Sequence, residues 1–313
     1  MRTTTLVSLS LAAALVLTAC GEDAPTFPSS SPASELAKGG VKGNAVGSGR
    51  IVYAHKFEDG FLDIYTMNPD GSAVTRVLQA SGYSNWAPRW SPDQSRIVFV
   101  SNRTGAEKIF IMNSGGTGQK QLTEGGCADR SPSISPDGNQ VAFQRACAGG
   151  GIFVVNVNGT GLTQVTTNSA DLGPTWLPDG SRIIFSNNYE STKGIYRVKL
   201  DGTDRFPIEV CPLIECRSPM FSPDGKRLAF WSPANGGQIT IHTFADHSYV
   251  NLANLGLQSH YPPTFSPDGT KLIFTAGPYG MDYELWSVNS TDGSGLTRLT
   301  TTPGPDVGPS WHR

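Results

Sequence analysis

The chain has 313 residues, of which 38% are hydrophobic and 16% are charged, and its formal net charge is −2. A chain with so little excess charge has no broad basic field for a phosphate backbone, so we expect no nucleic-acid partner. The length is sufficient for one folded domain with a sizeable core in addition to terminal segments.

The first 19 residues predict an export signal. Arg2 supplies a positive charge, and an apolar stretch of 14 residues follows from Leu6 to Ala19. Because about 20 apolar residues are needed to span a bilayer, this stretch suits a signal core better than a membrane helix. It ends in Leu17-Thr18-Ala19-Cys20, which resembles a bacterial lipobox. The resemblance implies cleavage before Cys20 and lipid attachment to its sulfur; the alternative is an ordinary signal in which Cys20 is incidental.

Residues 20–49 predict a lipidated cysteine followed by a flexible linker, because they are rich in Pro, Ser, Gly and Ala and lack apolar periodicity. Gly21, and not an aspartate, follows Cys20. In a bacterium with two membranes, this resembles the pattern of lipoproteins sent to the outer membrane. We therefore expect an exported protein, lipid-anchored in the cell envelope on the periplasmic side of the outer membrane.

Residues 50–313 repeat one block, in which Pro-x-aromatic or Pro-x-apolar precedes a turn of the Ser-Pro-Asp-Gly type and a short apolar run. The first prolines of the six copies are spaced by 42 to 46 residues, and they are Pro88, Pro132, Pro174, Pro219, Pro263 and Pro309. A period of about 40–45 residues with four β-like runs is typical of a propeller blade. The sequence therefore predicts an all-β, six-bladed β-propeller of four-stranded blades.

The two ends of this region complete one another. The sixth copy of the block stops at Trp311, two residues before the end of the sequence, whereas the apolar runs at 50–54, 62–67 and 74–78 have no such block before them. We expect the C-terminal segment to add the innermost strand to the N-terminal blade, which closes the ring without an open sheet edge. A closed ring needs no second chain, so we expect a monomer.

Three strings resemble the repeats of the TolB-type, WD-repeat-like propeller family: DIYTMNPDG at 63–71, SNRTG at 101–105 and TDGSGLTRLT at 291–300. The resemblance extends over about residues 49–313. Such repeats also resemble propeller parts of oligopeptidases and of some lyases, so they predict a fold and not a function. TolB proteins carry an α/β domain before the propeller, and we expect this chain to lack it because residues 21–49 are too few to form one.

Four cysteines remain besides Cys20, and an even number in an exported protein favours disulfides. Cys127 precedes the third inner strand, and Cys147 falls in the turn between the second and third strands of that blade, so both emerge on one face. Cys211 and Cys216 share one loop. We predict the bridges 127–147 and 211–216. A metal site is the alternative, but Cys-x4-Cys lacks a second pair at zinc spacing.

The position three residues before each motif proline predicts a ring of side chains near one opening of the channel. Its members are Asn85, Asp129, Asp171, Cys216, His260 and Asp306. Their neighbours at the same opening are Trp86, Arg130, Arg217 and Tyr261. The carboxylates suit a divalent cation, but the same residue types also cap strand starts by bonding to loop backbone. Both interpretations stay open, and we assign no resident metal or cofactor.

The sequence has no G-x-S-x-G elbow, no H-E-x-x-H and no Gly-rich phosphate loop, so we expect a non-catalytic protein. The leading hypothesis is a membrane-anchored envelope propeller that binds a protein or cell-wall component. Trp, Tyr and Arg dominate binding hot spots, so its contacts are assigned to Trp86, Arg130, Arg217 and Tyr261. The alternative is a metal-dependent, carbohydrate-active propeller of the lyase type. Resemblance to such lyases implies a histidine-rich manganese site, with candidates Asp129, Asp171, His260, Asp306 and His55.

Overall fold

The structure is a computed structural model that describes residues 49–189, 193–208, 210, 216–232, 238–252, 261–277 and 282–311. These residues belong to one compact unit, Val41–Arg313. The predicted signal peptide, Cys20 and the linker up to residue 48 lie outside the described residues, as do Cys211 and His260. None of the described segments forms a helix long and apolar enough to cross a membrane.

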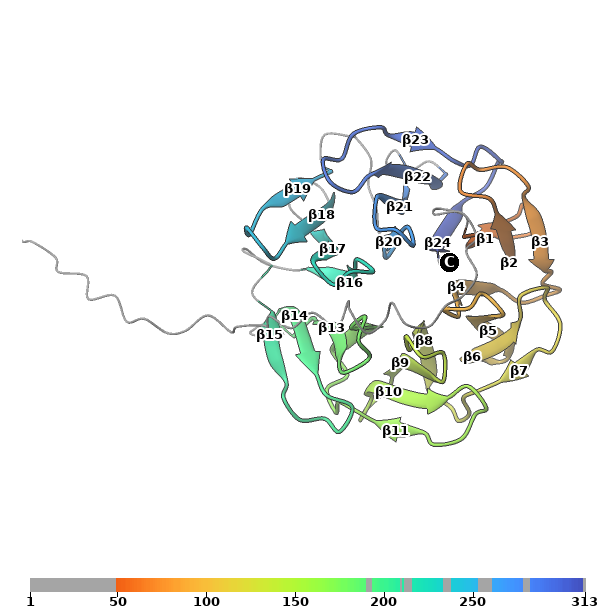
Figure 1. The fold of residues 1–313 in the computed structure, drawn as a ribbon. Coiled ribbons are helices and arrows are strands. Elements are labelled where there is room, and N and C mark those ends of the chain that lie inside the picture. Colours follow the sequence, from red (N-terminus) through yellow and green to blue (C-terminus); the bar gives the residue numbers. More distant parts are fainter. Residues whose placement is uncertain are drawn as a thin grey trace, which may run out of the picture. The chain divides into compact units, whose positions relative to one another are not determined.

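Six four-stranded antiparallel sheets surround a central axis and form a propeller (Figure 1). Blade one contains β24 (Asp306–Trp311), β1 (Ile51–Lys56), β2 (Leu62–Met67) and β3 (Thr75–Leu78). Blade two contains β4 (Asn85–Trp90), β5 (Arg96–Thr104), β6 (Ala106–Asn113) and β7 (Lys120–Gln121). Blade three contains β8 (Ala128–Ile134), β9 (Gln140–Ala146), β10 (Gly151–Asn156) and β11 (Thr163–Gln164).

The other three blades repeat this plan. Blade four contains β12 (Asp171–Trp176), β13 (Ile183–Asn187), β14 (Gly194–Val198) and β15 (Phe206–Ile208). Blade five contains β16 (Arg217–Phe221), β17 (Arg227–Ser232), β18 (Gln238–Thr243) and β19 (Tyr249–Asn251). Blade six contains β20 (Thr264–Phe265), β21 (Lys271–Ala276), β22 (Glu284–Asn289) and β23 (Thr297–Arg298). The predicted fold class is confirmed.

Blade one is built from both ends of the described chain, as the sequence predicts. β24 pairs antiparallel with β1, so that Ile51 faces Trp311 and His55 faces Asp306. Figure 1 shows β24, in the colour of the C-terminal end, beside the first strand of the chain. The inner edge of the N-terminal blade is therefore paired, and the ring is closed.

A tight turn joins the first and second strands in blades two to six. In blade three, the Gly138 amide donates to the Ser135 carbonyl (2.8 Å), and Gly138 has a φ of 74°. Blade two has Gln94 at this position, and Gln94 adopts a φ of 55°. The proline and aspartate of the motif favour this turn strongly enough for a non-glycine residue to accept the left-handed conformation.

The hydrophobic core lies between successive blades. One cluster combines Val52 and Ile64 of blade one with Trp90 and Phe99 of blade two. The second strands of blades two to five each bury a phenylalanine almost completely, and these are Phe99, Phe143, Phe185 and Phe230. Buried aromatic contacts of this size dominate core energetics. The repeated apolar runs of the sequence therefore become the interfaces that hold the blades around the axis.

The innermost strands share a left-handed residue directly before the motif proline. These residues have φ values of 49° to 64°, and they are Ala87, Ser131, Gly173, Ser218 and Gly308. The register with the second strand shifts at each of these places. Blade six has Pro262 at the equivalent position, and the proline ring fixes φ near about −65°. Its first strand, β20, correspondingly spans Thr264–Phe265 alone.

Candidate functional site in the central channel

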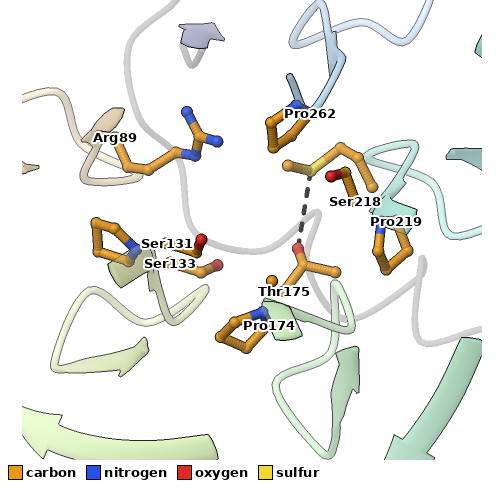
Figure 2. Close-up of a pocket in the computed structure, with 11 residues that line it drawn as sticks. Arg89, Ser131, Ser133, Pro174, Thr175, Ser218, Pro219 and Pro262 are labelled. Carbon is orange, nitrogen blue, oxygen red and sulfur yellow. Dashed lines mark hydrogen bonds between the residues drawn. The ribbon is translucent and has the colours of Figure 1, made fainter. Parts of the chain in front are cut away.

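A pocket lies on the propeller axis, where the innermost strands face one another (Figure 2). Its free volume is about 20 Å³, and residues from β4, β8, β12 and β16, together with Pro262 before β20, line it. Its polar lining groups are Arg89, Ser131, Ser133, Thr175 and Ser218. Because β-bulges re-aim the residues that follow them, the left-handed residue before the motif proline of blades two to five helps to turn these side chains toward the axis.

Arg89 brings the charge into this pocket. Its Nη1 donates to the carbonyl oxygens of Pro88 (3.0 Å), Gly308 (3.2 Å) and Pro309 (3.3 Å), so it reaches from blade two to the closing strand. Burial lowers the pKa of Arg89 to about 10, which leaves the guanidinium charged at neutral pH. In the part of the chain that the structure describes, the partners recorded for this guanidinium are carbonyl oxygens, and no salt bridge joins it to a carboxylate.

Our sequence reasoning missed Arg89, although the repeat contained the signal. Arg89 is the residue between the motif proline and the aromatic residue of blade two. The equivalent residues of the other blades are uncharged, and they are Ser133, Thr175, Met220, Thr264 and Ser310. A single charged residue at a position that is otherwise small, hydroxyl-bearing or apolar indicates a local role and not a repeated architectural one.

The predicted ring of polar residues is buried inside the blades. Asp129 is fully buried, and it accepts hydrogen bonds from Arg145 Nε (2.7 Å) and Nη2 (2.9 Å) and from Lys108 Nζ (3.2 Å). Arg145 is the residue directly opposite Asp129 on the second strand. The carboxylate is thus part of a cross-strand ion pair that fastens the start of the inner strand to its neighbour.

The other described members of the ring behave in the same way. Asp171 accepts from Asn187 Nδ2 (2.6 Å) and Arg205 Nη2 (2.7 Å), and it is fully buried. Asn85 accepts from Arg103 Nη2 (2.8 Å). Asp306 lies 2.7 Å from His55.

The side chains of Asn85, Asp129, Asp171 and Asp306 therefore do not face solvent, and a binding role for them near the opening stays a prediction. Each is at most 1% exposed, and each is paired inside its own blade. These residues hold the first two strands of a blade together. This role resembles the capping of strand starts considered above, but the partners are side chains and not loop backbone. Cys216 is buried and disulfide-bonded.

The same pairing bears on the lyase alternative. Lys108 and Arg145 pair with Asp129 and Arg205 pairs with Asp171, whereas Oδ2 of Asp171 and Oδ2 of Asp306 accept no hydrogen bond within the described part of the chain. Among the described residues, no three His, Cys, Asp or Glu side chains are grouped so that they could hold a metal ion. His260 lies outside the described residues, so the lyase-type site stays a prediction.

Cys127 and Cys147 form a disulfide with a Cα–Cα distance of 5.6 Å, which confirms the first predicted bridge. The bridge ties the start of β8 to the turn between β9 and β10. The pairing of Cys211 with Cys216 stays a prediction, because Cys211 lies outside the described residues.

The four residues next to the buried ring are more accessible, and together we call them the mouth surface: Trp86, Arg130, Arg217 and Tyr261. Each is the residue directly after its blade's member of the predicted polar ring, so all four lie at the same end of the propeller. The four differ in how freely they face solvent.

Arg130 is exposed and forms an ion pair with Glu107. Arg217 is partly exposed, donates to Asn188 Oδ1 (3.4 Å) and lies over the Trp231 ring at 5.8 Å. Trp86 packs partly against the core between blades two and three. Tyr261 is half-buried, and this burial raises the pKa of its hydroxyl. The mouth surface thus combines aromatic faces with two guanidinium groups.

Comparison with known proteins agrees with this architecture. The model of the TolB beta propeller domain family, PD40, matches residues 47–213. The chain is 33% identical over 143 residues to the protein TolB homolog of Chlorobium luteolum, covering 45% of this chain and 32% of that protein. It is 26% identical over 256 residues to the Tol-Pal system protein TolB of Francisella tularensis, covering 77% of this chain and 57% of that protein.

The crystal structure of TolB from Acinetobacter baumannii has a similar fold, with a TM-score of 0.74 at 23% identity, covering 85% of this chain and 67% of that one. The chain spans from about a third to just over half of the length of the curated relatives described above. Because the family model covers more than half of the 313 residues and the blades are those of a six-bladed propeller, the chain belongs to the TolB beta propeller domain family.

Proposed function

We propose that this protein is a non-catalytic, membrane-anchored propeller of the bacterial cell envelope that binds an envelope protein or a cell-wall component. The observation that carries the proposal is the mouth surface, where two arginines and two aromatic residues gather at one end of a closed ring. Arg, Trp and Tyr are the residue types that most often dominate binding energy at interfaces. A propeller end is also a concave site of the kind that ligands occupy.

Family membership supports an envelope role. One of the relatives is named as a Tol-Pal system protein, which favours a protein-binding task in the envelope over a catalytic one. The lipobox-like segment ending in Cys20 and the linker to residue 49 supply the anchor in this proposal. The linker would hold the propeller away from the membrane surface, on the periplasmic side of the outer membrane, as a monomer.

The proposal is tested by cross-linking capture from intact envelopes, with the anchored protein as bait. The structure refines the variant to be compared with it. Trp86 packs against the core, so Arg130→Ala combined with Arg217→Ala is the first choice, because Arg130 is exposed and Arg217 is partly exposed. Lys199→Ala combined with Lys226→Ala is the matched control, because these exposed lysines lie in turns at the opposite end of the blades.

A partner captured by the native bait and by the lysine control, but lost with the arginine variant, would support a binding module that uses the mouth surface. Equal capture by all three baits would remove the mouth surface from the proposal. Absence of any specific partner for the native bait would contradict the binding function itself.

A further inference from the structure

Arg89 holds a charge in a partly enclosed place, where the described residues provide no matching anion. Its Nη1 is bonded to three carbonyl oxygens, which supply partial negative charge but no formal counter-charge. Arg89 is partly exposed, and the loss of hydration at its guanidinium lowers its pKa. A buried guanidinium usually pairs with a carboxylate or phosphate, because its fork of N–H donors matches their geometry.

The rest of the pocket is suited to the same kind of ligand. The hydroxyls of Ser131, Ser133, Thr175 and Ser218 share the pocket with Arg89. In Figure 2 the Arg89 side chain extends into the space from one side, and the oxygens of Ser131 and Ser133 point into it from the neighbouring blade. None of the described lining residues carries a carboxylate, and Arg89 supplies the one formal charge among them.

The dimensions limit the size of the ligand. The free volume of the pocket is about 20 Å³, which is far below the roughly 300–1,000 Å³ of sites that hold drug-sized ligands. Pro132, Pro174 and Pro219 form much of the wall, and their side chains leave little freedom to widen it. A single compact group fits such a space better than a sugar chain or a nucleotide.

From this combination we infer that the central channel is a binding site for a compact anionic group, a carboxylate or a phosphate, held by Arg89 and by the serine hydroxyls around it. The group enters along the axis, between the innermost strands. The inference goes beyond the proposed function, because it concerns the channel and not the mouth surface. A free small anion and a carboxylate on a bound chain share this chemistry.

The test is a thermal melt of the purified full-length protein in sodium phosphate, sodium acetate or sodium chloride at equal ionic strength. N-acetylaspartate amide and N-acetylasparagine amide form a second pair of probes, which represent a carboxylate carried by a protein and its neutral equivalent. For a site of millimolar affinity, about 100 mM of an accepted anion should raise the melting temperature by about 5 °C relative to chloride.

Phosphate also stabilises proteins generally by exclusion from their surfaces, so the readout is the dependence of the shift on Arg89. We expect Arg89→Gln to abolish the anion-specific shift and Lys226→Gln to retain it, since the latter removes one exposed positive charge outside the pocket. Arg89→Lys keeps the charge but lacks the fork, so it should retain part of the shift and serves if Arg89→Gln does not fold.

A shift with phosphate or acetate that depends on Arg89 would identify a site for free anions. A shift with the aspartate derivative alone would identify a site for a carboxylate of a bound chain. Equal shifts in the native protein and the Arg89 variants, for every probe, would overturn the inference, and they would leave the capture experiment on the mouth surface unaffected.

Discussion

His55 and Asp306 are 251 residues apart in the sequence, and their side chains meet with a distance of 2.7 Å between Nδ1 and Oδ1. They face each other across β1 and β24, the two strands that close the ring. Both are nearly inaccessible, with 3% and 1% of their surface exposed. A slip of one residue in this pairing would turn every side chain of β24 to the opposite face, so the pair helps to specify the register of the closure.

We expect Asp306→Ala to lower the free energy of unfolding by about 3 kcal/mol, because it leaves a buried polar ring without its partner. Chemical denaturation measures this. Glu58→Ala, in the exposed loop that follows β1, should have little effect and serves as the control. The double variant with His55→Ala should cost less than the sum of the single variants, and strict additivity would contradict a direct interaction.

Ser131 adopts a φ of 52°, and the bulge of blade three depends on this conformation. Ser131→Pro should destabilise the protein by about 3 kcal/mol or more, because proline cannot adopt a positive φ. Ser131→Gly should stabilise it by up to about 1 kcal/mol, since glycine adopts this region without steric cost. Melting temperatures test both directions, and Ser131→Ala isolates the loss of the hydroxyl. A native-like melt for Ser131→Pro would show that the bulge is dispensable.

The Cys127–Cys147 bridge spans a sequence separation of 20 residues. Cross-links of this span restrict the unfolded chain, and we expect the double variant Cys127→Ser/Cys147→Ser to lose about 3 kcal/mol of stability. Because Cys216 is also disulfide-bonded, substitution is a cleaner test than a reducing agent. Unfolding curves that coincide with those of the native protein would contradict this expectation.

The turn aspartates predict how stability responds to acid. The Ser91 hydroxyl donates to Asp93 Oδ1 (2.6 Å), and this hydrogen bond, with those from Ser95, lowers the pKa of Asp93 from 3.8 to about 2. A carboxyl with a depressed pKa in the folded state contributes its stability above the unfolded value and loses it as the pH falls through the folded value. Stability should therefore decrease between pH 3.8 and about 2.

Asp93→Asn should flatten that part of the pH profile of unfolding. Asp137, which accepts from Ser135 (2.5 Å), has its pKa lowered by the same interaction, so Asp137→Asn should add to the effect. An NMR titration of the Asp93 carboxyl is the direct check. A midpoint at the ordinary aspartate value would refute the proposed role of the serine hydroxyl.

The sequence was sufficient to predict the architecture, because the determining features are local and periodic. The spacing of the motif prolines determined the number of blades, and the Pro-Asp turns determined where strands reverse. The unmatched block ending at Trp311 determined the closure of blade one. Cys127 and Cys147 were paired correctly because both could be placed in loops on one face of a single blade.

Tertiary structure alone decided which polar side chains are buried and which face the channel. In five of the six blades a left-handed residue before the motif proline interrupts the alternation of the inner strand, so counting residues could not show that Asp129 and Asp171 turn inward. Their partners come from other strands of the blade. The position of Arg89 depends on a contact between residues farther apart in the sequence, because it donates to the Gly308 carbonyl, 219 residues away. Such contacts exist because the ring closes, and a linear pattern does not contain them.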